Sequence, residues 1–156
     1  MIHKINSVFV PEEKAILNMV ARDTDNLTSE VEELVYNLRE TAAANIENCI
    51  GLSSTQIWKD PSTPPVSVFI AVMQDNRWGV FINPKILKRW NKEVTGLEGC
   101  MSVPGRQETI TRARHILVAY RDHEWNEVNG LHLFDFQARL FQHEYDHLQG
   151  KLIYDR

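Results

Sequence analysis

Cysteine is scarce in this chain of 156 residues, which contains only Cys49 and Cys100. Two thiols cannot build the disulfide framework of a small secreted domain. The first ten residues also show no apolar leader segment. We therefore expect a cytoplasmic protein in which both thiols stay free, so each cysteine needs its own explanation.

Long apolar runs and concentrated positive charge are missing too. No stretch approaches the roughly 20 apolar residues of a membrane-spanning helix, so we expect no membrane partner. Basic residues are scattered and the net charge is −4, which argues against a direct nucleic-acid site. A hydrophobic share of 43% and a charged share of 24% are typical of an ordinary globular protein. The length predicts a single domain over residues 1–156.

Helical patterns lie at both ends of the chain. Pro11 followed by two glutamates is typical of a first helical turn. Ser29 and Glu32 have capping-box spacing and predict the start of a second helix. Its apolar stripe comprises Val31, Leu34, Val35, Leu38 and Ala42. A last helix is predicted from Asp135 to Gly150, with three side chains turned inward: Phe136, Leu140 and Phe141.

Runs rich in β-branched and aromatic residues predict strands at 66–73, 78–82, 116–120 and 128–134. Asn76 and the pair Asn129-Gly130 predict hairpin turns, and residues 50–56 lack helical periodicity. The predicted fold class is α+β, with mainly antiparallel strands packed around the C-terminal helix.

The segment 143–147 reads His-Glu-Tyr-Asp-His and is the strongest chemical signal. His143 and His147 lie one helical turn apart, so both imidazoles can meet one metal ion while Glu144 reaches a nearby water. A tetrahedral catalytic site needs a third protein ligand. After His147 the chain offers only Asp155, so that ligand is expected upstream.

Cys100 is the best candidate for the third ligand. It lies in the segment 98–105, Glu-Gly-Cys-Met-Ser-Val-Pro-Gly, where glycine and proline favour a non-helical loop. A thiolate with two imidazoles suits Fe²⁺ or Zn²⁺ and leaves a position open for water. Hydrolysis requires such an open position.

Together these stretches resemble the peptide deformylase family, which removes the formyl group from the N-terminal formylmethionine of new proteins. The first family motif matches at Gly51-Leu52 and Gln56, the second at 98–104 and the third at 142–147. The resemblance covers nearly the whole chain and implies one catalytic domain of the peptide deformylase fold.

The resemblance implies a metal site and catalytic groups. Cys100, His143 and His147 would hold one divalent ion, with Fe²⁺ as the native ion and Zn²⁺, Ni²⁺ or Co²⁺ as alternatives. Glu144 would take a proton from the attacking water and pass it to the leaving amine. The side-chain amide of Gln56 and the backbone N–H of Met101 would stabilise the oxyanion.

Substrate contacts follow from the same resemblance. The partner would be an N-formylmethionyl peptide, paired by main-chain groups of Ile50, Gly51 and Gly105. The methionine pocket would use Ile50, Phe136, Leu140 and the ring of His143. Glu98 and Arg112 match a family pair that supports the metal-binding loop.

Some positions depart from the family pattern. Cys49 stands where most members have glycine, and Ser53 and Ser54 stand where they have alanine. We expect Cys49 to act as a small buried hydrophobe and the serines to have turn or hydrogen-bonding roles. The chain ends at Arg156 without the C-terminal helix by which many members dock on the ribosome. We therefore expect a compact, phage-like member without ribosome docking.

Two other functions fit part of the pattern. One is a small zinc peptidase, which His143, Glu144 and His147 alone would allow, although neither a glutamate nor a third histidine follows as a ligand. The other is a non-catalytic formyl-peptide-binding module, suggested by the altered first motif.

Overall fold

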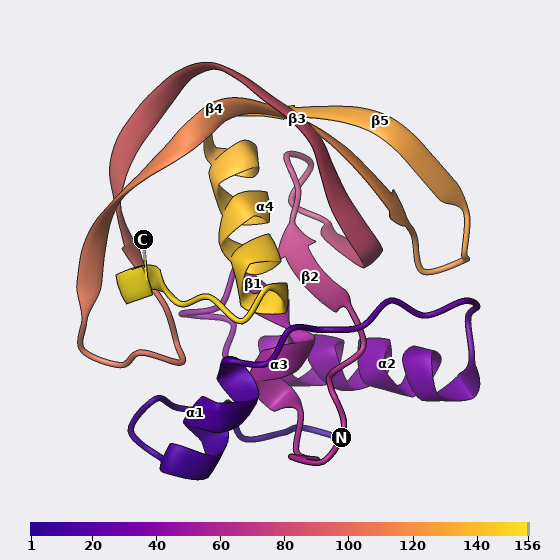
Figure 1. Cartoon of the computed structure of the whole chain (residues 1–156). Coiled ribbons are helices and arrows are strands. Elements are labelled where there is room, and N and C mark those ends of the chain that lie inside the picture. Colours follow the sequence, from indigo (N-terminus) through magenta and orange to yellow (C-terminus); the bar gives the residue numbers. More distant parts are fainter. Residues whose placement is uncertain (156) are drawn as a thin grey trace.

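A computed structural model describes residues 1–155 of the chain. Five strands form an antiparallel sheet in the order β1-β2-β3-β4-β5 (Figure 1). They are β1 (Gly51–Ser53), β2 (Val68–Val72), β3 (Trp78–Gly99), β4 (Gln107–Arg121) and β5 (Glu127–Phe134). The helices are α1 (Pro11–Leu17), α2 (Ser29–Ala44), α3 (Ser54–Ile57), α4 (Asp135–Leu148) and a 3₁₀ turn, η1 (Ile153–Asp155). The predicted α+β class is confirmed.

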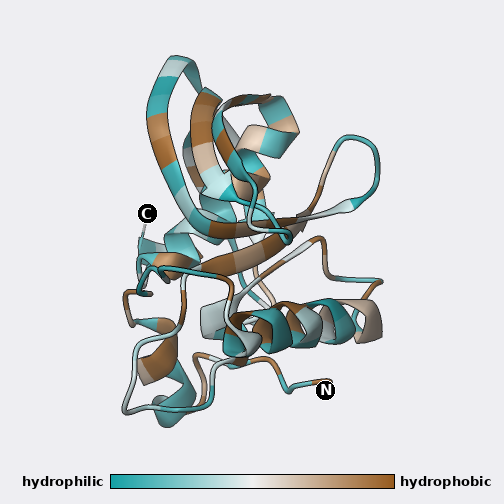
Figure 2. Cartoon of the chain, turned by 90° about the vertical axis from the view of Figure 1, so that its right-hand side faces the viewer, coloured by the Kyte–Doolittle hydropathy of each residue, from teal (hydrophilic) through white to brown (hydrophobic). Residues whose placement is uncertain are grey.

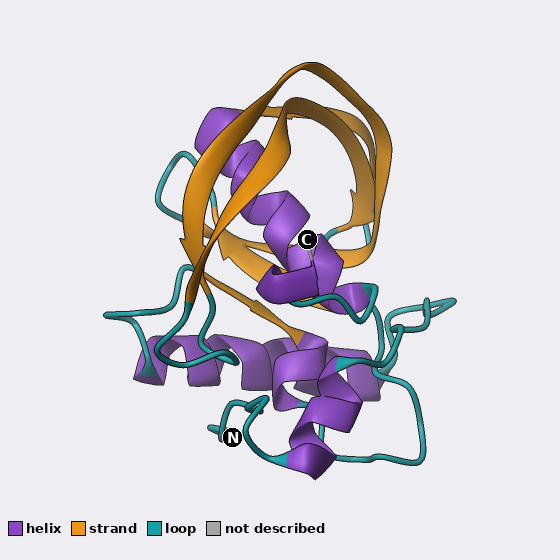
Figure 3. Cartoon of the chain, turned by 60° about the vertical axis from the view of Figure 1, so that its left-hand side comes forward, coloured by secondary structure: helices purple, strands orange, loops and turns teal. Residues whose placement is uncertain are grey.

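The C-terminal helix α4 lies beneath the arch that β3, β4 and β5 form, as Figures 1 and 3 show. Its apolar side packs into a core with the inner faces of the sheet, through Phe141 and Leu148 on the helix and Phe69, Phe81 and Ile116 on the strands. Phe141 meets both sheet phenylalanines edge-on, with ring centroids 5.0 and 5.4 Å away. This packing fixes the helix that carries both motif histidines.

Helix α2 covers β1 and β2 with the predicted stripe, and the hydropathy colouring of Figure 2 shows its polar side turned outward. All five predicted apolar positions of α2 are buried, which confirms the stripe. The cap is one residue earlier than expected, because the hydroxyl of Thr28, and not Ser29, accepts the N–H of Val31. No helix of residues 1–155 is long and apolar enough to cross a membrane.

One local prediction was wrong: Asn129-Gly130 is not a hairpin turn. Asn129 and Gly130 lie inside β5, where Ala119 pairs with Asn129 and Val118 with Leu131. Gly130, at φ +98°, is therefore the extra residue of a β-bulge and not a hairpin turn. Residues 54–57 form the single turn α3, which is too short to show helical periodicity. Asn76, at φ 62°, does lie in the β2–β3 turn as predicted.

Candidate metal centre and active site

Helix α4 and the end of β3 bring the three proposed ligands together. The ligand atoms of Cys100, His143 and His147 all lie within 4.8 Å of one another, and Sγ of Cys100 is 3.3 Å from Nε2 of His147. The two imidazole rings stand one helical turn apart with centroids at 5.1 Å. A soft thiolate with two imidazoles fits a divalent transition metal and leaves room for a further ligand. The residues present therefore fit the metal ion that the sequence predicts.

A buried ionic network holds this centre in place. Glu98 accepts hydrogen bonds from Nδ1 of His143 at 2.8 Å and from Nε and Nη2 of Arg112 at 2.6 and 2.9 Å. A guanidinium N–H of Arg139 also donates to Glu98, and Arg112 donates to Asp146 at 2.8 Å. Since Nδ1 of His143 is engaged with Glu98, its Nε2 is left for a metal.

The electrostatics favour the ligand form of Cys100. Burial alone would raise the pKa of its thiol, but the charge of His147 and hydrogen bonds from both histidines hold that pKa well below its usual value. Burial would lower the pKa of His143, yet hydrogen bonds with Cys100 and Glu98 raise it. The lowered pKa of Cys100 and the raised pKa of His143 both favour a thiolate–imidazolium pair when no metal is bound.

Glu144 is buried next to the metal ligands at 3% exposure. Its Oε2 accepts the Ser53 hydroxyl at 2.7 Å, while its Oε1 faces Gly51, where an added Cβ would lie only 2.5 Å away. Burial raises the pKa of this carboxyl, and the charges of His143 and His147 partly offset that rise. A carboxyl whose pKa is raised binds a proton more readily than an exposed glutamate does, as proton transfer requires.

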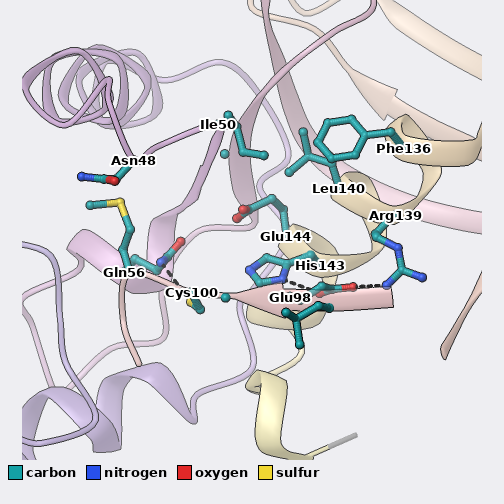
Figure 4. Close-up of a pocket in the computed structure, with 14 residues that line it drawn as sticks. Asn48, Ile50, Gln56, Glu98, Cys100, Phe136, Arg139, Leu140, His143 and Glu144 are labelled. Carbon is teal, nitrogen blue, oxygen red and sulfur yellow. Dashed lines mark hydrogen bonds and ion pairs between the residues drawn. The ribbon is translucent and has the colours of Figure 1, made fainter. Parts of the chain in front are cut away.

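The amide of Gln56 is oriented at both ends. Its Oε1 accepts the backbone N–H of Ser53 at 2.9 Å, and its Nε2 donates to Oγ of Ser102 at 3.1 Å. The same Nε2 lies 3.8 Å from Sγ of Cys100. The side chain therefore presents N–H groups beside the metal centre, as Figure 4 shows.

An open cleft leads to these groups. Four of the predicted substrate residues line this cleft: Ile50, Gly51, Phe136 and Leu140. The catalytic and metal-binding side of the cleft is lined by Gln56, Glu98, Cys100, Met101, His143 and Glu144. Gly105 lines the adjoining hollow, which shares Ile50, Cys100 and Met101 with the first. Phe136, in the first turn of α4, does not face inward as predicted: it lines the cleft and is 57% exposed.

Cys49 lies in the core formed by α2, β1 and β2, at 2% exposure, as expected for a small hydrophobe. Its thiol points to the carbonyl of Gly51 at 3.4 Å. Burial and the nearby charge of Glu144 raise the pKa of Cys49 to about 12. Cys49 is therefore chemically distinct from Cys100.

Sequence reasoning missed Arg139, and it expected a turn or hydrogen-bonding role for Ser53 without indicating Glu144 as its partner. Arg139 lines the cleft and bridges Glu98 to the carbonyls of Val94 and Ile110. Its spacing four residues before His143 on one helix was the available signal. Ser53 and Glu144 are 91 positions apart in the sequence, so no local sequence pattern predicts their contact.

A buried carboxyl beside a thiolate–imidazole donor set, at the bottom of an open cleft, defines a metal-dependent hydrolase. The family model of polypeptide deformylase matches residues 6–156. The chain is 37% identical to peptide deformylase 1 of Clostridium perfringens over 90% of both chains. It is 35% identical to the peptide deformylase of Pseudothermotoga lettingae, over 90% of this chain and 76% of that protein.

Comparison with solved structures also indicates the peptide deformylase family. The crystal structure of peptide deformylase from Thermotoga maritima superposes with a TM-score of 0.85 at 27% identity, covering 100% of this chain and 97% of the other. The chain belongs to the peptide deformylase family. It is a metal-dependent hydrolase that removes the N-formyl group from nascent peptides.

Proposed function

We propose that Cys100, His143 and His147 hold one Fe²⁺ ion as the native cofactor. The observation that carries the proposal is the approach of the three ligand atoms to within 4.8 Å of one another, beside a buried glutamate. The same ligands also suit Zn²⁺, Ni²⁺ and Co²⁺. When bound, the ion supplies Lewis acidity, which lowers the pKa of water and polarises the formyl carbonyl.

Glu144 acts as the general base and then as the general acid. It takes a proton from the attacking water, and it delivers this proton to the amine nitrogen as the C–N bond of the formamide breaks. Its burial beside Gly51 and Ser53 keeps competing water away from the carboxyl. Gln56 and the backbone N–H of Met101 donate to the oxygen on which negative charge develops.

The peptide pairs with the open edge of the sheet. Among the described strands β1 lies at one end of the sheet order, next to β2. The N–H of Val72 already donates to the carbonyl of Ile50, and Gly51 pairs with Ala71. In this register the N–H and C=O of Gly51 point away from β2, where an extended peptide can reach them.

The side chain of the formylated methionine occupies the apolar part of the cleft. Ile50, Phe136 and Leu140 line it, next to the ring of His143. Gly105 supplies a further main-chain contact in the adjoining hollow. Glu98 and Arg112 support the metal ligands through the hydrogen bond from His143 to Glu98.

We further propose that residues 1–156 form one catalytic domain that works in the cytoplasm of a bacterial or phage-infected cell. The family match over residues 6–156 supports one domain, and the bacterial relatives support the location.

The test is formate release from formyl-Met-Ala-Ser by protein purified without oxygen and reloaded separately with Fe²⁺, Ni²⁺ or Zn²⁺. We expect Cys100→Ser to lose both metal and activity, and Glu144→Ala to keep its metal while losing activity. Formate release by Glu144→Ala at the parent rate would remove the proposed role of Glu144. Metal binding without formate release by the parent protein would instead indicate a binding module.

A further inference from the structure

Ser53 connects two of the catalytic side chains. It is the last residue of β1, lies directly before α3 and is fully buried. Its backbone N–H donates to Oε1 of Gln56 at 2.9 Å, and its hydroxyl lies 2.7 Å from Oε2 of Glu144. The backbone contact remains with any side chain at this position, whereas the hydroxyl contact requires serine or threonine. The two contacts can therefore be separated by mutation.

The Ser53 hydroxyl contacts only one of the two carboxyl oxygens of Glu144. Among residues 1–155, Ser53 is the hydrogen-bond donor recorded for this carboxyl, and it reaches Oε2. The backbone carbonyl of Glu144 also lies 3.1 Å from the same hydroxyl, so Ser53 contacts both ends of the residue. Oε1 lies against Gly51, which lines the cleft and has no side chain to cover it. Among residues 1–155 no donor is hydrogen-bonded to Oε1, so Oε1 is the oxygen left to accept a hydrogen bond from water or substrate.

We propose that Ser53 is a positioning residue that holds Oε2 of Glu144 and so assigns Oε1 as the oxygen that moves the proton. This rests on the proposed role of Glu144. An O–H bond of water breaks while one forms on Oε1, and the water oxygen bonds to the formyl carbon. The proton then passes from Oε1 to the amine nitrogen as the C–N bond breaks, giving a free amine and formic acid, which releases its remaining proton to solvent as formate.

The neighbouring Ser54 provides a matched control. It is also fully buried, but its hydroxyl has no hydrogen-bond partner among the described residues. Replacing either serine by alanine removes one buried hydroxyl oxygen, and the two positions are adjacent in the sequence. Only the change at Ser53 removes a contact with Glu144.

The experiment compares Ser53→Ala, Ser54→Ala and Glu144→Gln, each reloaded with Ni²⁺ and checked for metal content and unfolding temperature. We expect kcat of Ser53→Ala to fall about tenfold with KM within about twofold of the parent, since a hydrogen bond to a charged group is lost. Ser54→Ala should keep kcat within about twofold. If the role of Ser53 were merely structural, Ser53→Ala would lower the unfolding temperature but would not lower kcat selectively while KM stays near the parent value.

A second measurement does not depend on turnover. In crystal structures of the metal-free proteins, the Glu144 carboxyl should keep one orientation in the parent and in Ser54→Ala but rotate or become disordered in Ser53→Ala. If Ser53→Ala matches Ser54→Ala in kcat and in carboxyl orientation while Glu144→Gln is inactive, the role of Ser53 is overturned and that of Glu144 stands. If Glu144→Gln keeps the parent rate, the proposed function of Glu144 fails first.

Discussion

Oε1 of Glu98 accepts a hydrogen bond from Nδ1 of His143 at 2.8 Å, so a buried carboxylate fixes which nitrogen of the ring faces the metal centre. This contact also keeps the imidazole from rotating when no metal is present. Glu98 in turn is held by Arg112 and Arg139. The orientation of a metal ligand on α4 therefore depends on residues of β3 and β4.

Glu98→Gln should weaken metal binding by about 10- to 100-fold, because a neutral amide orients and polarises the His143 ring less well than a carboxylate. Competition with a chromogenic chelator measures the affinity. Glu93→Gln is the control, since Glu93 is an exposed residue of the same strand. Equal metal affinities of the two variants would contradict the role assigned to Glu98.

Arg112 should matter for stability far more than its neighbour Arg114. Arg112 is 4% exposed and forms ion pairs with both Glu98 and Asp146, so Arg112→Met removes the buried cation that these two buried carboxylates share. We expect the free energy of unfolding to fall by about 3–5 kcal/mol. Urea denaturation of the metal-free proteins measures it.

Arg114→Met is the matched control on the same strand. Arg114 pairs with Asp135, and both side chains are about half exposed. Loss of such a surface pair should cost about 0–1 kcal/mol. Similar losses in the two variants would show that the buried network does not stabilise the fold.

The sequence predicted that the side chains of Cys100, His143 and His147 would come together, partly because the two histidines have a local signature. The i, i+4 spacing of His143 and His147 needs only a helix, and α4 provides it from Asp135 to Leu148. The stripe of α2 was equally predictable, since burial and helical period coincide there. Cys100 required more, because only its non-helical surroundings and the family resemblance indicated that it would meet the histidines.

The long hairpin of β3 and β4 was only partly predicted, for a physical reason. Strand patterns are recognised by apolar residues at alternate positions, but two inward positions of this hairpin hold Glu98 and Arg112. At these two buried positions an ion pair between Glu98 and Arg112 stands where a strand pattern would have apolar side chains. Gly130 misled in another way, because a bulge and a hairpin turn both favour a glycine with positive φ.

The two cysteines should react differently with iodoacetamide. In the metal-free folded protein the pKa of Cys100 lies well below its usual value, which favours the thiolate, so Cys100 should be alkylated faster than Cys49. Cys49 should stay unmodified up to about pH 9, since its pKa of about 12 keeps it protonated and it is buried. Peptide mass mapping after timed quenching distinguishes them, and added metal should protect Cys100. Faster labelling of Cys49 than of Cys100 would contradict both assignments.

Gln56→Ala should lower kcat/KM for formyl-Met-Ala-Ser by about 10²–10³-fold while metal content stays unchanged. The amide N–H groups lie beside Cys100 but the amide is not a metal ligand, so its loss removes charge stabilisation and not the ion. Formate release and elemental analysis of the same samples test both parts. Loss of metal from this variant would show that Gln56 acts through the ligands.

Gly51→Ala should place a methyl group 2.5 Å from Oε1 of Glu144, a distance that forces the carboxyl to move. We expect kcat to fall about 10²-fold, because displacement of a catalytic group by about 1 Å has effects of this size. The free energy of unfolding should also fall by about 1–3 kcal/mol through overpacking.

A double variant identifies the cause of both losses. In a Glu144→Ala background the side chain that collides with the new methyl group is absent, so Gly51→Ala should then cost little stability. The backbone of Gly51 lies outside the left-handed region, so alanine itself introduces no strain there. If Gly51→Ala is equally destabilising with and without Glu144, the contact between Gly51 and Oε1 does not explain why a residue without a side chain is needed at this position.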